Sequence, residues 1–390
     1  MTTLAGSFLG SGTDDGWGTD AKFSDPQGLA SDTSGNVYIA ERDSHRIRKV
    51  TPWGQVSHYV GNTGFSGSAD GLPSAANFHS PSDVAVDSAG NVYVADSGNH
   101  AIRKIAANGT VSTWAGLMGS AGSSNATGTQ ARFNFPQGVA VDSANNVYVA
   151  DTGNSVIRKI SPSRVVTTLA GAIFTGSASE HYGRESFTGS ACGGFIGSSD
   201  GDIPESVDGT GTAARFSFPT DVEVDASGNV YVTDSGTSKI RKIATNGVVT
   251  TLGNTPEGFF YHPLDLAVTS QGIIFVADTG DNRVAMSFDP VPVVSVETIG
   301  GLILSNNGVA QNLGASLSQA STNTASFRIR NLGFADLSGI AFAKTGSHTN
   351  DFNFVTPFAT TLPSGADATF SVAFVPSTGG NRNAQIRIQQ

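Results

Sequence analysis

Four carboxylates recur around one point of a repeated pattern and could together bind a hard cation. In three places an aspartate stands two residues after a proline, and in one of them a glutamate follows two residues later. These acids are Asp83, Asp221, Asp265 and Glu223. Calcium prefers carboxylate oxygens of this kind, whereas aspartate also caps the turns that precede strands. The pattern therefore leaves two interpretations open. The four acids could line the mouth of a central channel and bind calcium, or they could cap turns.

Histidines test whether the chain is an enzyme. Only His79 and His262, just before Pro81 and Pro263, lie where a side chain could reach the same mouth. Two histidines without a third ligand fall short of a catalytic zinc set. The single cysteine, Cys192, excludes an internal disulfide framework and a cysteine-based zinc site. We therefore predict no catalytic residue.

Aromatic residues in long polar loops are the side chains that the repeat does not explain. Trp17 stands between two glycines, and Phe65, Phe187 and Phe195 lie in similar loops. An exposed ring suits stacking on a sugar or anchoring a protein partner. We predict that these four residues bind a glycan or protein ligand on the face that carries the channel mouth.

A repeated unit of four strands must position all of these residues. In the copy that begins at Pro81, alternation and β-branched residues predict strands at 83–86, 92–95, 102–105 and 111–115, with an Asn-Gly turn at 108–109. Each copy is too short to bury its own apolar face, so the copies must stack. Four antiparallel strands joined by tight turns make a propeller blade, which predicts an all-β propeller.

The repeat predicts five blades and a closed ring. Residues 3–5 match the fourth strand of a copy, and the last copy ends at its third strand, near Val284 and Met286. We expect these two segments to pair and remove the open sheet edges. Six blades remain possible if the insertion at 172–207, which we interpret as a long loop, forms a degenerate blade or if further blades precede the chain.

The charged residues inside the repeat have structural explanations. An acid at the turn between the second and third strands is expected to accept backbone N–H groups; these acids are Glu41, Asp96, Asp151, Asp234 and Asp278. An arginine on the third strand is expected to lay its stem over apolar surface and pair its head with neighbouring acids; these arginines are Arg48, Arg103, Arg158 and Arg241.

Composition narrows the class of partner. The 390 residues carry a formal net charge of -10 and no basic run, which argues against nucleic acid and anionic membranes. No apolar stretch is long enough to cross a bilayer. The composition is typical of an exported protein, and we expect a secreted or cell-surface fragment of a longer chain that stops abruptly after Gln390.

The repeats resemble NHL repeats of bacterial proteins over residues 1–288. The resemblance rests on the motifs Asn99-His100, Gly90-Asn91-Val92-Tyr93-Val94-Ala95-Asp96 and Ile102-Arg103-Lys104-Ile105. Residues 289–390 resemble an Ig-like sandwich of the choice-of-anchor D or abnormal-spindle/hydin type, through Phe327-Arg328-Ile329-Arg330-Asn331 and Phe370-Ser371-Val372-Ala373-Phe374.

These resemblances imply a non-catalytic bacterial scaffold that binds through the loop-rich propeller face, with further Ig-like domains in the full-length protein. One alternative is a metal-dependent lyase or lactonase-type hydrolase at the channel mouth, since similar propellers use histidines there. A second alternative is a structural spacer within a large surface protein.

Overall fold

The computed structural model divides the chain into two compact units, which we describe separately: Met1–Ser270 with Ile274–Ser287, and Gln271–Ile273 with Phe288–Gln390. The described residues are 3–7, 10–62, 64–173, 205–252, 260–269, 273–288, 294–298, 303–304, 323–331, 337–338, 340–345, 348–355, 360–363, 366–375, 377 and 385–389. Phe187 and Phe195, and most of the predicted insertion around them, lie outside these residues.

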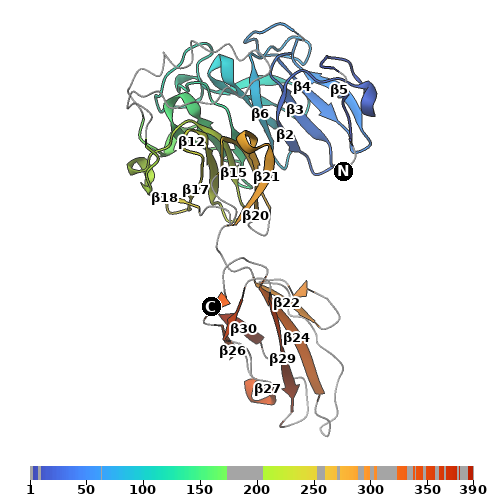
Figure 1. The fold of residues 1–390 in the computed structure, drawn as a ribbon, viewed down its shortest axis with the longest axis vertical. Coiled ribbons are helices and arrows are strands. Elements are labelled where there is room, and N and C mark those ends of the chain that lie inside the picture. The colour runs from blue at the N-terminus through green and yellow to red at the C-terminus, as the bar shows by residue number, and fades with distance from the viewer. Residues whose placement is uncertain are drawn as a thin grey trace. The chain divides into compact units, whose positions relative to one another are not determined.

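Antiparallel sheets built from successive strands make up the first unit (Figure 1). Sheet 1 contains β2 (Pro26–Ser31), β3 (Val37–Glu41), β4 (Arg46–Val50), β5 (Gln55–Val60) and, outermost, β1 (Gly16–Trp17). Sheet 2 contains β6 (Pro81–Val86), β7 (Val92–Asp96), β8 (Ala101–Ile105) and β9 (Val111–Ala115). Sheet 3 contains β10 (Val139–Val141), β11 (Val147–Asp151), β12 (Val156–Ile160) and β13 (Val166–Ala170).

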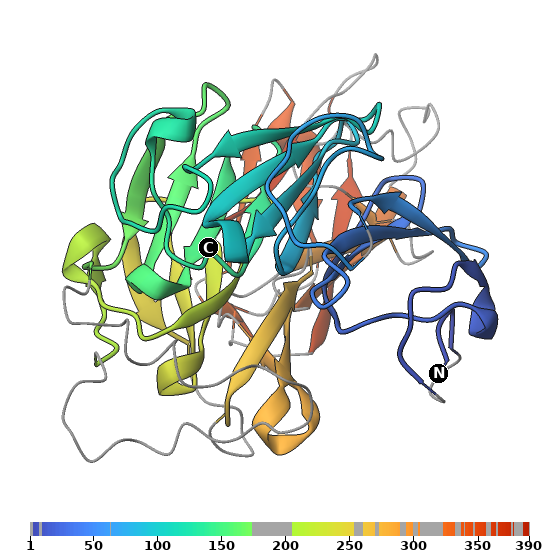
Figure 2. The same cartoon turned by 90° about the horizontal axis from the view of Figure 1, so that it is seen from above.

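The remaining two sheets of this unit continue the pattern. Sheet 4 contains β15 (Pro219–Val224), β16 (Val230–Asp234), β17 (Lys239–Ile243), β18 (Val248–Thr251) and, outermost, β14 (Gly209–Thr210). Sheet 5 contains β19 (Pro263–Val268), β20 (Ile273–Asp278) and β21 (Arg283–Phe288). Figure 2 shows the sheets following one another around a common centre, from the blue first sheet to the orange fifth. The all-β class and the four-strand unit are thus confirmed.

Single 3-10 turns are the helical elements of the described chain. They are η1 (Gly18–Asp20), η2 (Ser97–Asn99), η3 (Gly128–Gln130), η4 (Thr152–Asn154), η5 (Gly211–Ala213), η6 (Ser235–Thr237), η7 (Thr279–Asp281) and η8 (Thr349–Asp351). Within the described residues, no helix has the length and apolar character that a membrane crossing requires.

The first turn of each repeat shows why the sequence folds this way locally. Asp87 Oδ1 accepts the backbone N–H groups of Ala89 and Asn91 at 3.0 and 2.9 Å. Its Oδ2 accepts the Asn91 side-chain amide at 2.7 Å. Gly90 has φ +78°, a conformation that glycine adopts without the steric cost of a side chain. The turn therefore fixes the register of the two strands that it joins.

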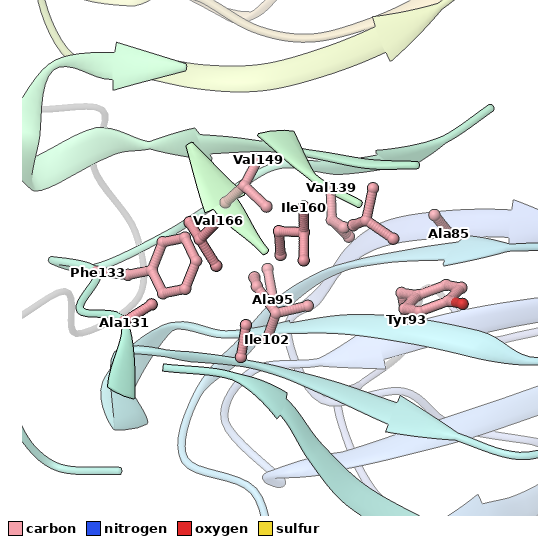
Figure 3. Packing of buried hydrophobic residues seen from close by; sticks show 12 residues of the cluster. Ala85, Tyr93, Ala95, Ile102, Ala131, Phe133, Val139, Val149, Ile160 and Val166 are labelled. Carbon is pink, nitrogen blue, oxygen red and sulfur yellow. The ribbon is translucent and has the colours of Figure 1, made fainter. Parts of the chain in front are cut away.

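Apolar side chains pack between consecutive sheets and hold them together. Figure 3 shows the junction of sheets 2 and 3, where Tyr93 and Ile102 belong to the same buried cluster as Phe133, Val149 and Ile160. Similar clusters join sheets 1 and 2, sheets 3 and 4, and sheets 4 and 5. The stacking predicted from the short repeat is the source of the core.

The pairing predicted between residues 3–5 and the last strand is not found in the described chain. Residues 3–7 form no strand, and the Gly6 N–H donates instead to the Gly18 carbonyl at 2.9 Å. The Gly116 N–H, just after β9 of sheet 2, donates in the same way to Gly128 beside sheet 3 at 3.1 Å. Residues 3–6 therefore lie next to sheet 1 in the same way that the end of β9, the last strand of sheet 2, lies next to sheet 3.

Within the described chain, sheets 1 and 5 each have one face that no other sheet covers. These faces carry apolar residues at positions that are buried between sheets elsewhere in the unit. Leu29 on β2 is 64% exposed, whereas Val84, at the same place on β6, is 3% exposed. Val284 on β21 is 75% exposed, whereas Ile102 on β8 is fully buried. Closure of the ring between sheets 1 and 5 and the number of blades both stay predictions.

The second unit is also all-β. A five-stranded antiparallel sheet has the order β23 (Ile303–Leu304), β22 (Val294–Thr298), β24 (Asn323–Asn331), β29 (Asp367–Phe374) and β27 (Phe352–Phe354). Two further pairs are β25 (Leu337–Ser338) with β28 (Thr361–Leu362), and β26 (Ala341–Thr345) with β30 (Gln385–Gln389). Phe327 stacks on Phe370 with ring centroids 5.2 Å apart. The Ig-like assignment of this unit stays a prediction.

Candidate functional site

A buried arginine organises the interior of each of the first four sheets. Arg103 donates from Nη1 to Asp96 Oδ2 at 2.8 Å and from Nη2 to Asp70 Oδ1 at 2.7 Å. Its guanidinium carbon lies 5.2 Å from the centre of the Phe78 ring. Arg48, Arg158 and Arg241 are equally buried and stack on Phe23, Phe133 and Phe216.

The predicted pairing of these arginines with neighbouring acids is confirmed, and the structure adds that the charged heads are fully buried. An inner acid, an outer acid or amide, and an aromatic ring replace water around each guanidinium, so the whole side chain is buried. The second acid, such as Asp70, was not linked to the arginine by sequence reasoning. The sequence does contain a regular spacing that could have indicated the pair, because this outer partner precedes its arginine by 33 positions in each of the first four sheets.

The turn acids act as the sequence predicts. Asp96 Oδ1 accepts the backbone N–H of His79 at 2.7 Å, while Oδ2 accepts the Asn99 amide at 2.8 Å as well as Arg103. Equivalent backbone bonds reach Glu41, Asp151, Asp234 and Asp278. These five carboxylates are thus part of the fold and are not available to a ligand.

The four candidate calcium ligands lie on the innermost strands β6, β15 and β19, and two of them join consecutive sheets. Asp83 accepts the N–H of Val84 with Oδ1 and the N–H of Val139, on sheet 3, with Oδ2, both at 2.7 Å. Asp221 Oδ2 accepts the N–H of Leu266, on sheet 5, at 3.0 Å. Sequence reasoning did not foresee these bonds between sheets.

Burial and neighbouring carboxylates favour the protonated forms of Asp83, Asp221 and Glu223. Burial raises the pKa of Asp83 and Asp221 well above their usual range, and the neighbouring Asp265 carboxylate raises both further. Burial also raises the pKa of Glu223 to about 7. The arrangement is suited to sharing protons among carboxyl groups. Within the described residues, no set of three or more His, Cys, Asp or Glu side chains is arranged to hold a metal. Calcium binding by Asp83, Asp221, Asp265 and Glu223 stays a prediction without a ligand geometry behind it.

The two channel-face histidines contact other rings instead of each other. His79 packs edge-on against His45, with ring centroids 5.7 Å apart, and His262 packs against Tyr261 at 4.8 Å. Neither joins Asp83 and Asp265 in a metal-binding set among the described residues. The geometry that the enzyme alternative requires is therefore not present there.

Two other histidines form bonds between sheets that sequence reasoning missed. His45 Nδ1 accepts the N–H of Ser80, just before β6 of sheet 2, and His100 Nδ1 accepts the N–H of Phe135, beside sheet 3, both at 3.1 Å. Both histidines have a left-handed backbone, with φ +55° and +56°. An imidazole can accept at Nδ1 only when it is neutral.

The loop aromatics occupy a different place from the predicted one. Trp17 lies on β1, the outermost strand of sheet 1, because β1 pairs with β5 rather than reaching the inner strand β2. Its partner Gln55 begins β5 beside the β4–β5 turn, whereas Asp83 lies near the start of β6, at the opposite end of the strands, so Trp17 does not share the face of the channel mouth. Trp17 is 56% exposed, and Phe65, in the loop after β5, is 68% exposed.

A second exposed tryptophan lies in the turn next to β1, and sequence reasoning did not single it out. Trp53 is 79% exposed and lies in the turn between β4 and β5. The Gly18 N–H donates to the Gly54 carbonyl at 2.9 Å, so each tryptophan precedes one end of this bond. The sequence offered a signal, because the same turn position in the other copies holds Asn108, Ser163 or Asn246. We call Trp17, Trp53 and Gln55, the residue opposite Trp17 on β5, the aromatic rim.

Comparison with known proteins identifies the repeat. Residues 23–50, 78–105, 133–160, 216–243 and 260–285 each match the NHL repeat. The first unit is an NHL-repeat β-propeller. NHL repeat-containing protein 2 of Gallus gallus is 42% identical over 93 residues, which are 23% of this chain and 12% of that protein. Its Bos taurus counterpart is 31% identical over 170 residues, 39% of this chain and 23% of that protein. The chain thus spans less than a quarter of these curated relatives.

Solved structures are similar to the chain only at low identity and with TM-scores below 0.5. A streptogramin B lyase has a TM-score of 0.44 and 12% identity, with 80% of this chain and 78% of that chain covered. A gluconolactonase of Xanthomonas campestris has a TM-score of 0.43 and 14% identity, with 68% and 72% covered. At these values the likeness carries no argument about activity.

Proposed function

We propose that this NHL-repeat propeller is a non-catalytic binding scaffold that recognises its ligand through exposed aromatic side chains. The observation that supports the proposal most is the aromatic rim, where Trp17 and Trp53 are both more than half exposed. Large aromatic side chains are the residues that dominate binding energy when they are buried by a partner. The repeat's arginines and turn acids are already bonded inside the sheets, so they support the fold rather than a reaction.

Finer features of the proposal follow from the sequence. The propeller has five blades closed by residues 3–5, and an Ig-like unit follows it as a spacer. The protein acts outside a bacterial cell, at its surface or in the medium. Phe65 extends the recognition surface beyond the aromatic rim, and the exposure of its side chain supports this role.

A comparison of binding with turnover tests the proposal. The purified chain is incubated with lactones and with cyclic depsipeptides, with and without added divalent metal, and products are followed by mass spectrometry. We expect no product above that of the buffer. Metal-dependent turnover that is lost in His79→Ala or His262→Ala would overturn the binding scaffold in favour of the lyase or lactonase alternative.

A further inference from the structure

The aromatic rim combines three exposed side chains that have no partner within the described chain. Trp17 and Gln55 are directly opposed across the β1–β5 pair, which places their Cβ atoms about 5 Å apart on one face of the sheet. Trp53 lies two residues before Gln55. No hydrogen bond, ion pair or ring contact joins any of these three side chains to the described residues.

Hydrogen bonds hold the backbone of the rim in place. The Gly18–Gly54 bond closes β1 onto the turn, and the Gly54 N–H donates to the Thr51 carbonyl at 2.9 Å. Gly54 has φ +88°, as expected at the left-handed end of a three-residue hairpin loop. Chain geometry therefore keeps the two tryptophan Cα atoms within about 12 Å of each other.

Other sheets of the same propeller lack this combination. The pair that corresponds to Trp17 and Gln55 is Thr127 with Val165 on sheet 3 and Thr210 with Val248 on sheet 4. The repeat thus needs neither a tryptophan nor an amide at these positions. Their presence on sheet 1 has no explanation in the packing of the blade.

We propose that the aromatic rim is a binding site for a neutral oligosaccharide, which deepens and rests on the proposed binding function. The electron-rich faces of the two indoles suit the C–H faces of sugar rings, and their N–H groups are free to donate to hydroxyl oxygens. The Gln55 amide offers an acceptor and two donors, which match hydroxyl groups that both donate and accept. The formal charge of -10 disfavours an acidic polysaccharide.

Affinity electrophoresis through gels that contain hydroxyethyl cellulose, xylan, laminarin or galactomannan tests the proposal, with alginate as the acidic control. We expect the full chain to be retarded by at least one neutral polymer and not by alginate. Trp17→Thr and Trp53→Asn, which introduce residues that other sheets carry at these places, should each weaken binding about thirtyfold, the loss typical of a hot-spot residue. Gln55→Ala should weaken it less.

A matched control separates the rim from a general effect of surface mutation. Leu72 follows Gly71, which bridges to Val111 of sheet 2, as Trp17 follows Gly16, and it is exposed to a similar degree. Leu72→Thr should leave retardation unchanged, and all four variants should melt with the wild-type chain. Absence of retardation in every neutral gel, or retardation that survives Trp17→Thr with Trp53→Asn, would overturn the sugar site. Neither result would bear on turnover, so the failure of the proposed function remains a separate outcome.

Discussion

Asp83 accepts a hydrogen bond of 2.7 Å from the backbone N–H of Val139, which belongs to the next sheet. Asp83, which the sequence suggests as a cation ligand, therefore forms a hydrogen bond that links two consecutive sheets. Asp221 forms the corresponding bond to Leu266. The protein places its acids where they satisfy buried backbone groups, and the concentration of like charge at the channel is a consequence of that arrangement.

Removing the acid at position 223 should make the protein less sensitive to alkaline pH. Burial raises the pKa of Glu223 from 4.5 to about 7 in the folded chain. The contribution of the protonated Glu223 carboxyl to the free energy of unfolding is fully present below pH 4.5 and is lost as the pH rises through about 7. Glu223→Ala introduces the residue that Ala30, Ala85, Ala140 and Ala267 provide in the other copies. We expect the variant to gain roughly 1–3 kcal/mol over wild type at pH 8 and little at pH 4, measured by chemical denaturation. An equal change at both pH values would show that the carboxyl does not titrate as described.

The histidine bonds between sheets should fail in acid, in the opposite sense. Burial, reinforced by the nearby His79, lowers the pKa of His45 and His100 below 6.5, while Asp43 and the Arg42 carbonyl act against this shift at His45. Each contribution is present above pH 6.5 and is lost as the pH falls through the folded pKa.

Asparagine at both positions should remove this dependence, since the equivalent Asn282 holds the same left-handed backbone in sheet 5. Between pH 7.5 and 5, the free energy of unfolding of the His45→Asn, His100→Asn double variant should fall by about 1–2 kcal/mol less than that of the wild type. Hydrogen exchange at the Ser80 and Phe135 amides measures the effect locally. Protection that is independent of pH in the wild-type chain would contradict it.

Breaking one arginine network should be costly, whereas neutralising its outer acid should not. Arg103→Met leaves Asp96 buried without its charge partner, and we expect a loss of about 3–5 kcal/mol. Asp70→Asn copies sheet 3, where Asn125 Oδ1 accepts from Arg158 at 2.8 Å, and should cost less than about 1.5 kcal/mol. Denaturant midpoints at constant slope measure both. Similar losses in the two variants would contradict the division of roles between the inner and outer partners.

Periodicity made the fold predictable, whereas the partners of individual side chains lay beyond it. The strand at 111–115 follows from local alternation and the Asn-Gly turn before it, and the structure has it at Val111–Ala115. The burial of Arg103 depends on Asp70, 33 positions away, and on the approach of a separate loop. Trp17 was placed on the wrong face because two-residue pairing with β5 leaves almost no sequence signal.

Ring closure can be tested through the register that the other sheets share. Ile102 faces Ala115 and Ile157 faces Ala170 across the last two strands of their sheets. The same register pairs Val284 with Ala5 if residues 3–5 complete sheet 5. In a Cys192→Ser background, Ala5→Cys with Val284→Cys should form an intramolecular disulfide under mild oxidation. Ala5→Cys with Ala285→Cys should not, because neighbouring strand residues point to opposite faces. Cross-links only between molecules, or none, would mean that another element completes the ring.

Fluorescence of the aromatic rim tests most directly whether the tryptophans, rather than the channel acids, contact the ligand. Trp114→Phe leaves Trp17 and Trp53 as the reporters, because the chain contains three tryptophans. Titration with the neutral polysaccharide that retards the protein should shift their emission, saturating at the same concentration as binding. The shift should persist in Asp83→Asn with Asp265→Asn. Unchanged emission at saturating polysaccharide, or a shift that requires the two aspartates, would contradict the account.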